Sequence, residues 1–443
     1  LATGGLFLSL LIAPLYLFSF KELSPVEDTS SISLIVEAAP EASMKETVGG
    51  FVDAVDVMLS EPTATYIWQS INPGLGFGGQ EFVSPGERDV TTHELLPTMS
   101  ERLKGVPTVT AFPSAQPSLP TAGQYDLEVV VTSSDSLDNM RRVANAMTGR
   151  AMTSGLFYFF ESGLKVDLLA VEYQLDKDRM ADLGMTLADL TSQMDLFVSE
   201  GYVTRYDERG RAYRVIPQLQ QAFKFSPEAL LDTPVVLPSG EQVPFGTFAV
   251  LRRNTEPRAL TRFQQKSSFK LFGGVIPGYT KEQALTYVED LADELLPPGY
   301  VLDYTGESRE IRREGNTMVN VLGLSLIMVF LVLALQFDSF RDPLIILLGS
   351  APLALFAAMV ITFTGFTTIN IYSQVGLITL VGLISKNAIL IVEFANQAQA
   401  QGMNKLQAIR AGSLYRLRPV LMTTGATVFG HFPLVLVEGA GAE

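Results

Sequence analysis

The sequence of 443 residues contains no cysteine and two histidines, His93 and His431. Without cysteine the chain cannot form disulfides or carry out thiol redox chemistry. Two isolated histidines provide no set of ligands spaced for zinc, and the sequence has neither a Gly-x-Ser-x-Gly elbow nor a Walker loop. We therefore expect a protein that is not an enzyme and that has no cofactor and no metal site.

Charge is also missing from long stretches of the sequence. Between Pro343 and Ser385 there is no charged residue at all. An α-helix needs about 20 predominantly apolar residues to cross a hydrocarbon core about 30 Å thick. On this basis we predict five membrane-spanning helices, at residues 1–20, 315–337, 343–363, 371–394 and 419–437.

The charged residues that remain predict which side of the membrane each loop faces. Residues 395–418 carry four basic and no acidic side chains, which is typical of a cytoplasmic loop. Residues 22–314 then lie on the opposite side. Their net charge of −17 does not oppose this topology, since long loops cross membranes largely regardless of charge.

The most informative single residue is Lys386, which lies inside the predicted span at residues 371–394. An ammonium group in hydrocarbon costs about 3 kcal/mol or more, so such residues usually face a charged partner or a water-filled path. The next charged residue, Glu393, is about 10 Å further along a helix. Lys386 therefore suggests movement of ions or protons. The alternative is a lysine that snorkels to the lipid headgroups.

Residues 22–314 show the alternating strand and helix patterns of α+β modules. The first module, at residues 24–121, has the order β-α-β-β-α-β, which is the split βαβ or ferredoxin-like unit, with a glycine-rich loop expected at residues 72–79. A second such module, at residues 122–165 and 261–308, is interrupted by an inserted module at residues 166–260. Its second helix opens with a capping box, Thr280-Lys-Glu-Gln283.

Several segments carry a resemblance to a known family. They are Gln374-Val-Gly-Leu-Ile-Thr-Leu-Val-Gly-Leu-Ile-Ser-Lys-Asn-Ala-Ile-Leu-Ile-Val-Glu-Phe-Ala395, Arg416-Leu-Arg-Pro-Val-Leu-Met-Thr423, Gly430-His-Phe-Pro-Leu434, Gly439-Ala-Gly-Ala442, Pro25-Val-Glu-Asp28 and Asp176-Lys-Asp-Arg-Met-Ala-Asp-Leu-Gly184. The chain resembles the C-terminal half of resistance–nodulation–division (RND) transporters of the hydrophobe/amphiphile efflux type, over essentially all its residues. The chain ends, without an initiator methionine and just after a span, also lead us to expect a fragment.

The resemblance implies a fold class: a polytopic α-helical membrane protein with a large α+β periplasmic region. That region would hold two ferredoxin-like porter modules, the second interrupted by an inserted docking module. The family implies a homotrimer in the bacterial inner membrane, driven by protons, that exports small amphiphilic substrates. Its partners would be a periplasmic adaptor protein, an outer-membrane channel and the lipid bilayer, with no nucleic acid. Exporters of metal ions or lipids, and a membrane-tethered periplasmic enzyme, are the alternatives.

The resemblance also implies a proton relay. Lys386 occupies the position of a lysine that pairs in such pumps with two aspartates on a span of the N-terminal half, and Arg416 and Thr423 fall at two further relay positions. A plain alternative exists for each of these last two. Arg416 could be a cytoplasmic topology anchor, and Thr423 could return a hydrogen bond to its own helix.

Substrate contacts are implied at Phe77 and Phe82, which align with phenylalanines of a pocket beside a glycine-rich switch loop. Leu75 stands where well-known members have an aromatic residue, so drug preference does not follow from the resemblance. The alternative is that both phenylalanines are ordinary core residues, because aromatic side chains are often buried.

Overall fold

The computed structural model describes residues 8–24, 27–116, 123–198, 201–217, 226–314, 317–365 and 367–436. Residues 1–7 and 437–443 lie outside the described residues. The second range includes the motif Gly439-Ala-Gly-Ala442, and Pro25 and Val26 of another motif also lie outside the described residues. The chain divides into two compact units. One comprises Leu1–Leu164 and Ala259–Glu443, and the other comprises Lys165–Arg258.

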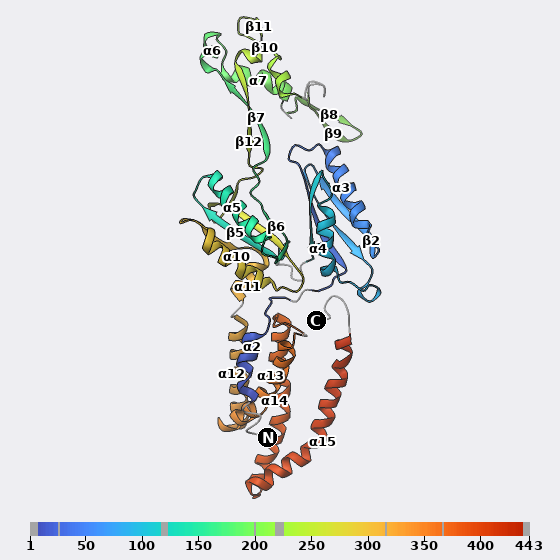
Figure 1. Ribbon diagram of the computed structural model, residues 1–443. Coiled ribbons are helices and arrows are strands. Elements are labelled where there is room, and N and C mark those ends of the chain that lie inside the picture. The colour runs from blue at the N-terminus through green and yellow to red at the C-terminus, as the bar shows by residue number, and fades with distance from the viewer. Residues whose placement is uncertain are drawn as a thin grey trace. The chain divides into compact units, whose positions relative to one another are not determined.

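The first α+β module forms a four-stranded antiparallel sheet with two helices (Figure 1). Its elements in chain order are β1 (Ser31–Ala38), α3 (Met44–Leu59), β2 (Ala64–Asn72), β3 (Leu75–Phe82), α4 (Thr92–Leu103) and β4 (Val109–Ala115). The strand order in the sheet is β2-β3-β1-β4. Both helices begin with a capping box, headed by Ser43 and Thr91, which satisfies N–H groups that the first turn leaves free.

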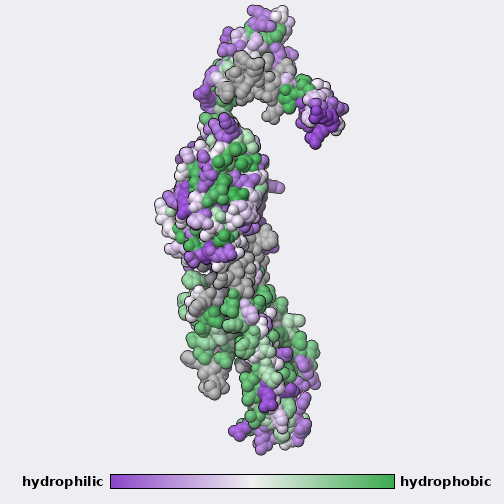
Figure 2. Space-filling view, turned by 90° about the vertical axis from the view of Figure 1, so that its right-hand side faces the viewer, coloured by the Kyte–Doolittle hydropathy of each residue, from purple (hydrophilic) through white to green (hydrophobic). Residues whose placement is uncertain are grey.

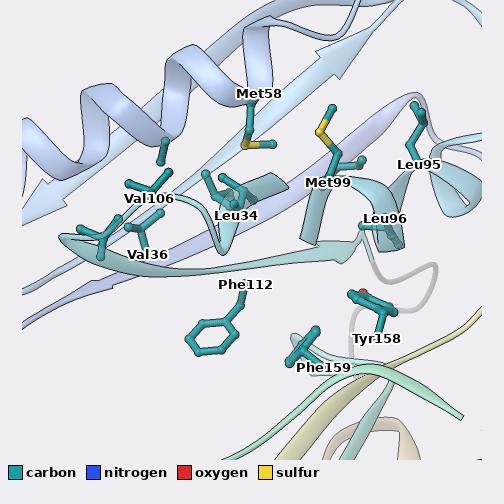
Figure 3. Packing of buried hydrophobic residues seen from close by; sticks show 14 of the residues in the cluster. Leu34, Val36, Met58, Leu95, Leu96, Met99, Val106, Phe112, Tyr158 and Phe159 are labelled. Atoms are coloured by element: carbon teal, nitrogen blue, oxygen red, sulfur yellow. The ribbon is translucent and has the colours of Figure 1, made fainter. Parts of the chain in front are cut away.

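One face of this sheet carries α3 and α4. Leu34 and Val36 of β1 form one buried cluster with residues of both helices, including Phe51, Met58 and Met99. Figure 3 shows Leu34, Val36, Met58 and Met99 gathered between the strand and the helices. This cluster holds the helices against the sheet and leaves the other face available for other contacts.

The segment expected as a glycine-rich loop at residues 72–79 is mostly strand, which corrects the prediction. The turn contains Gly74, and β3 begins at Leu75. A Cβ on Gly76 would lie 2.1 Å from the Phe51 ring, and one on Gly79 would lie 2.9 Å from the indole nitrogen of Trp68. These glycines therefore allow two aromatic rings to approach the strand, a role that composition alone does not distinguish from a loop.

The second α+β module has the same strand arrangement. Its elements are β5 (Leu127–Ser133), α5 (Leu137–Met152), β6 (Phe157–Ser162), β14 (Lys266–Val275), α10 (Lys281–Leu295) and β15 (Val301–Tyr304), with β13 (Thr261–Phe263) as a short hairpin partner of β14. Antiparallel pairing places β14 between β6 and β5, and β5 between β14 and β15. The predicted capping box at Thr280 and Gln283 is confirmed.

The two modules share a core through aromatic residues. Phe112 of β4 contacts Phe159 of β6, with ring centroids 5.5 Å apart, and the Tyr158 hydroxyl donates to the Pro113 carbonyl at 3.1 Å. Figure 3 shows Phe112, Tyr158 and Phe159 close together. β6 is therefore a core strand whose aromatic side chains join the modules, and the second module covers part of the otherwise open face of the first sheet.

The second unit, Lys165–Arg258, has a small core of its own. Its elements are β7 (Leu168–Leu175), α6 (Lys177–Asp182), α7 (Leu187–Val198), β8 (Thr204–Glu208), β9 (Arg211–Val215), α9 (Pro227–Leu231), β10 (Pro234–Val236), β11 (Gln242–Pro244) and β12 (Ala249–Glu256). β7 pairs with β12 along its whole length, so the two chain segments that enter and leave the unit run side by side.

The remaining elements are helices, and most of them are apolar. They are α2 (Ile12–Phe18), α11 (Gly306–Glu314), α12 (Thr317–Phe337), α13 (Arg341–Phe363), α14 (Ile371–Ala400) and α15 (Lys405–His431). Within the described residues, four helices are long and apolar enough to cross a membrane, and a shorter apolar helix covers Leu8–Phe18. Figure 2 shows a largely hydrophobic surface over this helical part, as expected where lipid replaces water.

One predicted boundary in this part is wrong. Residues 395–418 were expected to be a loop, but α14 continues to Ala400 and α15 begins at Lys405. Polar residues with good helix propensity, such as glutamine, lysine and arginine, extend a helix beyond the membrane because water can solvate its surface. The turn is therefore confined to residues 401–404, where Gly402 adopts a positive φ of 92° that suits glycine.

Candidate functional site

The helix that carries Lys386 is fixed at its first turn. Asn370 accepts a hydrogen bond from the Ser373 N–H at 2.9 Å, and the Ser373 hydroxyl oxygen accepts one from the Asn370 N–H at 2.9 Å. Asn370 is 3% exposed. From this cap α14 runs without interruption, and Lys386 lies about 24 Å along it at 1.5 Å per residue. The lysine is thus well inside the part of the helix that a bilayer would cover.

The surroundings of Lys386 are apolar. Leu377, Val381 and Ser385 form the buried stripe of α14, and the Ser385 hydroxyl donates back to the Val381 carbonyl at 2.7 Å. Lys386 is the next residue, about 100° around the helix from Ser385, and it is exposed. Within the described part of the chain it makes no ion pair and no hydrogen bond.

The second half of α14 packs closely against the first half of α15. Gly412 makes this possible, since a Cβ there would lie 3.2 Å from the Ile391 carbonyl oxygen and 3.6 Å from the Cβ of Ala395. Ala398 and Ala408 are buried as well. Small residues let two apolar helices approach within van der Waals distance, which is a main source of helix association in lipid.

Arg416 lies beside this contact. Its guanidinium carbon is 5.7 Å from the centroid of the Phe394 ring, and Phe394 in turn contacts Tyr415. The Nε of Arg416 is buried and has no hydrogen-bond partner among the described residues. A buried donor without an acceptor is uncommon and requires a reason. The Nε–H of Arg416 could donate a hydrogen bond to a group that the described residues do not include.

Thr423 is exposed on α15, and its hydroxyl donates to the Val420 carbonyl at 3.1 Å. This geometry agrees with the alternative to a relay role, in which the Thr423 hydroxyl bonds only to its own helix. Between Ser413 and Leu436 no described residue is fully buried. This half of α15 therefore presents free apolar surface on all sides.

The structure does not bring the three relay candidates into contact. Arg416 lies level with Phe394, which is about 12 Å from Lys386 along α14. Thr423 follows Arg416 by about 10 Å along α15, which runs antiparallel to α14 after the turn at residues 401–404. The three residues lie on two neighbouring helices, and among the described residues they form no hydrogen-bonded cluster.

The substrate candidates lie on opposite faces of β3. Side chains alternate along a strand, so Phe77 shares one face with Leu75 and Gly79, whereas Phe82 points to the face covered by helices. Phe77 is 50% exposed and Phe82 is 6% exposed, within the buried cluster of the module. The two phenylalanines do not line one pocket in this conformation, and the core alternative describes Phe82.

Phe77 belongs instead to an exposed aromatic face that the sequence did not single out. Tyr66 and Trp68 of β2 lie on the same face of the sheet as Phe77 and Leu75 of β3, as the strand register requires. The rings of Trp68 and Phe77 meet edge to face at 6.1 Å, and all four side chains are exposed. We refer to Tyr66, Trp68, Leu75 and Phe77 as the aromatic face. The period-two spacing of Tyr66 and Trp68, the latter the one tryptophan of the sequence, was an available signal.

A buried ionic cluster lies in the second module. Lys281, at the start of α10, approaches Glu307 of α11 at 2.6 Å and Asp126 at 3.5 Å, and these three side chains are at most 13% exposed. Burial opposes ionisation of Lys281, but the charges of Glu307 and Asp126 outweigh it and hold the pKa of Lys281 above its ordinary value. Burial raises the pKa of Glu307, although Lys281 opposes this shift.

A second network explains part of the Pro25-Val-Glu-Asp28 motif. The Asp28 carboxylate accepts hydrogen bonds from Arg88, from the Ser30 N–H at 3.0 Å and from the Thr92 hydroxyl at 2.9 Å. Burial raises the pKa of Asp28, but these donors outweigh it and bring the pKa below its ordinary value. Asp28 thereby ties the segment before β1 to the start of α4.

Comparisons with known proteins agree with this picture. Residues 2–443 match the family model described as the AcrB/AcrD/AcrF family, so the chain belongs to this family of RND efflux transporters. It is 34% identical over 364 residues to an uncharacterized transporter of Haemophilus influenzae, which is 80% of this chain and 35% of that protein.

Two relatives have more informative names. The toluene efflux pump membrane transporter TtgB of Pseudomonas putida is 36% identical over 273 residues, 61% of this chain and 26% of that protein. The multidrug export protein AcrF of Escherichia coli is 31% identical over 328 residues, 73% of this chain and 31% of that protein. The matched region spans about a third of the length of such relatives.

Proposed function

We propose that this chain is part of a pump that exports hydrophobic or amphiphilic compounds and is driven by protons. The observation that carries the proposal is Lys386, a cation deep in an apolar helix without a counter-charge among the described residues. A cation at this depth in a membrane usually pairs with carboxylates or faces a water-filled path. We propose that two aspartates elsewhere in the complete pump supply them. Protonation of these partners would release Lys386 and shift packed helices between two arrangements.

Arg416 and Thr423 are proposed as further members of the relay. The free Nε of Arg416 supports this role, because it leaves a charge-assisted donor for a carboxylate or a water chain. The helix contact at Gly412 places Arg416 on the immediate neighbour of the Lys386 helix. Thr423 has weaker support, since its hydroxyl already has an acceptor in its own helix.

For the substrate we propose the aromatic face, with Phe77 as the sequence-derived member and Tyr66 and Trp68 as its neighbours. Phe82 was the other candidate, and its burial leaves no surface for a ligand in this conformation. Exposed aromatic rings with few directed polar groups suit amphiphiles, which bind mainly by apolar burial. They offer little to a metal ion, which takes charged or polar ligands.

The modules suggest the wider assembly. We propose that both α+β modules are ferredoxin-like porter modules in the periplasm, an assignment that the shared strand order supports. Lys165–Arg258 would be the docking module. Its β8–β9 hairpin is exposed at every residue, and such hairpins are marginal alone, which favours contact with other subunits. The pump would be an inner-membrane homotrimer with an adaptor and an outer-membrane channel.

The decisive test is Lys386→Ala in the complete pump, with Lys405→Ala as the matched control. Lys405 begins α15 and is exposed at the turn between two helices. We expect Lys386→Ala to lower dye efflux by about 100-fold or more with normal expression and folding, and Lys405→Ala to pump normally. Retained efflux in Lys386→Ala would sink the proposed relay.

The substrate class is tested separately by whole-cell susceptibility. Cells that lack other pumps and express this one should tolerate more dye and solvent, and Trp68→Ala and Phe77→Ala should reduce that tolerance. Protection against metal salts, with no protection against dyes, would favour metal export.

A further inference from the structure

The segment that leaves α2 and the segment that enters α14 are bonded side by side. The Ile369 N–H donates to the Phe20 carbonyl at 2.8 Å, the Glu22 N–H donates to the Ile369 carbonyl at 3.0 Å, and the Ile371 N–H donates to the Leu23 carbonyl at 3.1 Å. Lys21 and Ile369 form a parallel bridge. We call residues 20–23 and 369–371 the clamp. It joins backbone segments that are far apart in the sequence.

Side chains reinforce the clamp. Ile369 is 1% exposed and packs in a small core with Met359 of α13 and Leu377 of α14. The Thr368 hydroxyl donates to the Glu22 carboxylate at 3.3 Å. Backbone hydrogen bonds next to an apolar core are costly to break, because no water replaces the lost partner. The start of α14 and residues 20–23 should therefore move as one body.

The clamp also meets both α+β modules around one cavity. This cavity has a volume of about 360 Å³. Its walls include Phe20, Glu22 and Thr368 at the clamp, His93 of α4 in the first module, and Asp126 and Lys281 of the second module. A displacement of the clamp would therefore reach groups of both modules directly.

On the other side of the clamp lies an uninterrupted helix. Asn370 caps α14 within the clamp, and Lys386 follows about 24 Å further along. A helix of this kind transmits displacement along its axis as a rigid element. Beyond the clamp the chain reaches Asp28, whose bonds to Arg88 and Thr92 lead to α4.

We propose that the clamp is the mechanical link through which movement of the Lys386 helix is passed to the first α+β module, with Glu22 and Ile369 as its positioning residues. This proposal rests on the proton-driven transport proposed above. The clamp residues handle neither protons nor substrate. They determine whether proton movement and substrate movement stay coupled.

The test uses the full-length pump in liposomes with an imposed pH gradient, where proton flux and dye transport are recorded together. Glu22→Pro removes the N–H that donates to Ile369. Leu23→Pro is the matched control, because the clamp uses the carbonyl of Leu23 and not its N–H. We expect Glu22→Pro to lower dye transport about tenfold while proton flux stays within about twofold of the unmodified pump, and Leu23→Pro to change neither.

Two results would overturn the proposal: dye transport in Glu22→Pro equal to that of the unmodified pump, or an equal loss of dye transport and proton flux. The second would mean that the clamp only supports the helix bundle. Failure of proton-driven transport itself is seen separately, as dye transport without proton movement in the unmodified pump.

A cross-link decides the question if Glu22→Pro does not fold. The chain has no cysteine, so Lys21→Cys with Ile369→Cys places one pair at the bridge, in a pump whose remaining part also lacks cysteine. The reduced form of the same protein is the control. If the clamp moves as one body, dye transport by the oxidised protein should stay within about twofold of dye transport by the reduced form. A loss of transport on oxidation, restored by reduction, would show that the segments separate and would overturn the proposal.

Discussion

Two regions of this protein each contain a lysine that lies away from bulk water or inside a helix that a bilayer would cover, and the two lysines differ in their ionic partners. In the second α+β module Lys281 has Glu307 at 2.6 Å and Asp126 at 3.5 Å. In α14 Lys386 has no ionic partner among the residues that the structure describes. The first cation is satisfied by elements that this chain supplies, so its site is a closed structural unit. Lys386 lies in an apolar helix and has no counter-charge among the described residues.

The difference separates stability from function. A buried ion pair is satisfied in the folded state, and loss of one partner leaves a charge without compensation. A cation without a partner gains nothing from its position within this chain, so its presence points to a group that arrives from elsewhere or changes charge. The two lysines can therefore be distinguished by what their removal damages.

The largest effect on stability is expected for Lys281→Met. Removing the ammonium leaves two buried carboxylates unbalanced and should lower the local free energy of unfolding by about 3–5 kcal/mol. Hydrogen exchange of α10 and α11 in the full-length protein measures this loss, with Lys266→Met, an exposed lysine of β14, as the control. Equal protection in the two variants would contradict the closed-unit description of Lys281.

A smaller effect is expected for the double variant Lys281→Met with Glu307→Gln. The glutamine removes one of the two unbalanced charges at nearly unchanged volume, so the double variant should recover about 1–3 kcal/mol relative to Lys281→Met. The same exchange measurement on both variants and on Glu307→Gln alone gives the coupling energy of the pair. Strict additivity of the two substitutions would mean that the side chains do not form a pair.

A still smaller effect on stability is expected for Lys386→Met, despite its large expected effect on transport. The methionine removes a charge from an apolar helix, and the proposed aspartate partners can take up protons once they lose their counter-charge. We therefore expect the free energy of unfolding of the full-length pump to change by about 1 kcal/mol at most. Thermal unfolding in detergent measures it. A strong destabilisation would place Lys386 with Lys281 as a structural lysine.

The smallest effect concerns His93, which shares the cavity with Lys281. Burial lowers the pKa of His93, while Asp126, the Glu27 carbonyl and Asp28 oppose the shift and Lys281 adds to it. The folded state favours the neutral form of a histidine whose pKa is lowered on folding. The stability that this histidine contributes is therefore fully present above its unfolded pKa of about 6.5. It should fall as the pH drops from there through the folded pKa.

His93→Gln should flatten this pH dependence without a large change at pH 8. Exchange protection of α4 between pH 8 and pH 5 gives the comparison, after correction for the intrinsic rate. An unchanged slope would show that another group, such as Glu307, governs the response.

Much of the architecture could be predicted from local signals. The apolar stretches located the four long helices, because a helix in lipid must be long and apolar whatever surrounds it. The Thr280 capping box also follows from local pattern. The strand after Asn72 could not be predicted from local pattern. Its glycines leave room for the rings of Phe51 and Trp68, which approach from other elements.

The candidate site divides in the same way. The sequence by itself determined that a lysine lies inside a span, because depth depends only on distance along one helix. It did not determine which of Phe77 and Phe82 is buried, since the face of β3 that the helices cover depends on how β3 pairs with its neighbours. The tertiary structure alone decided which charged groups meet, because it brings Asp126, Lys281 and Glu307 together. Ion pairs act over a few ångströms, and only the folded chain brings such distant residues within that range.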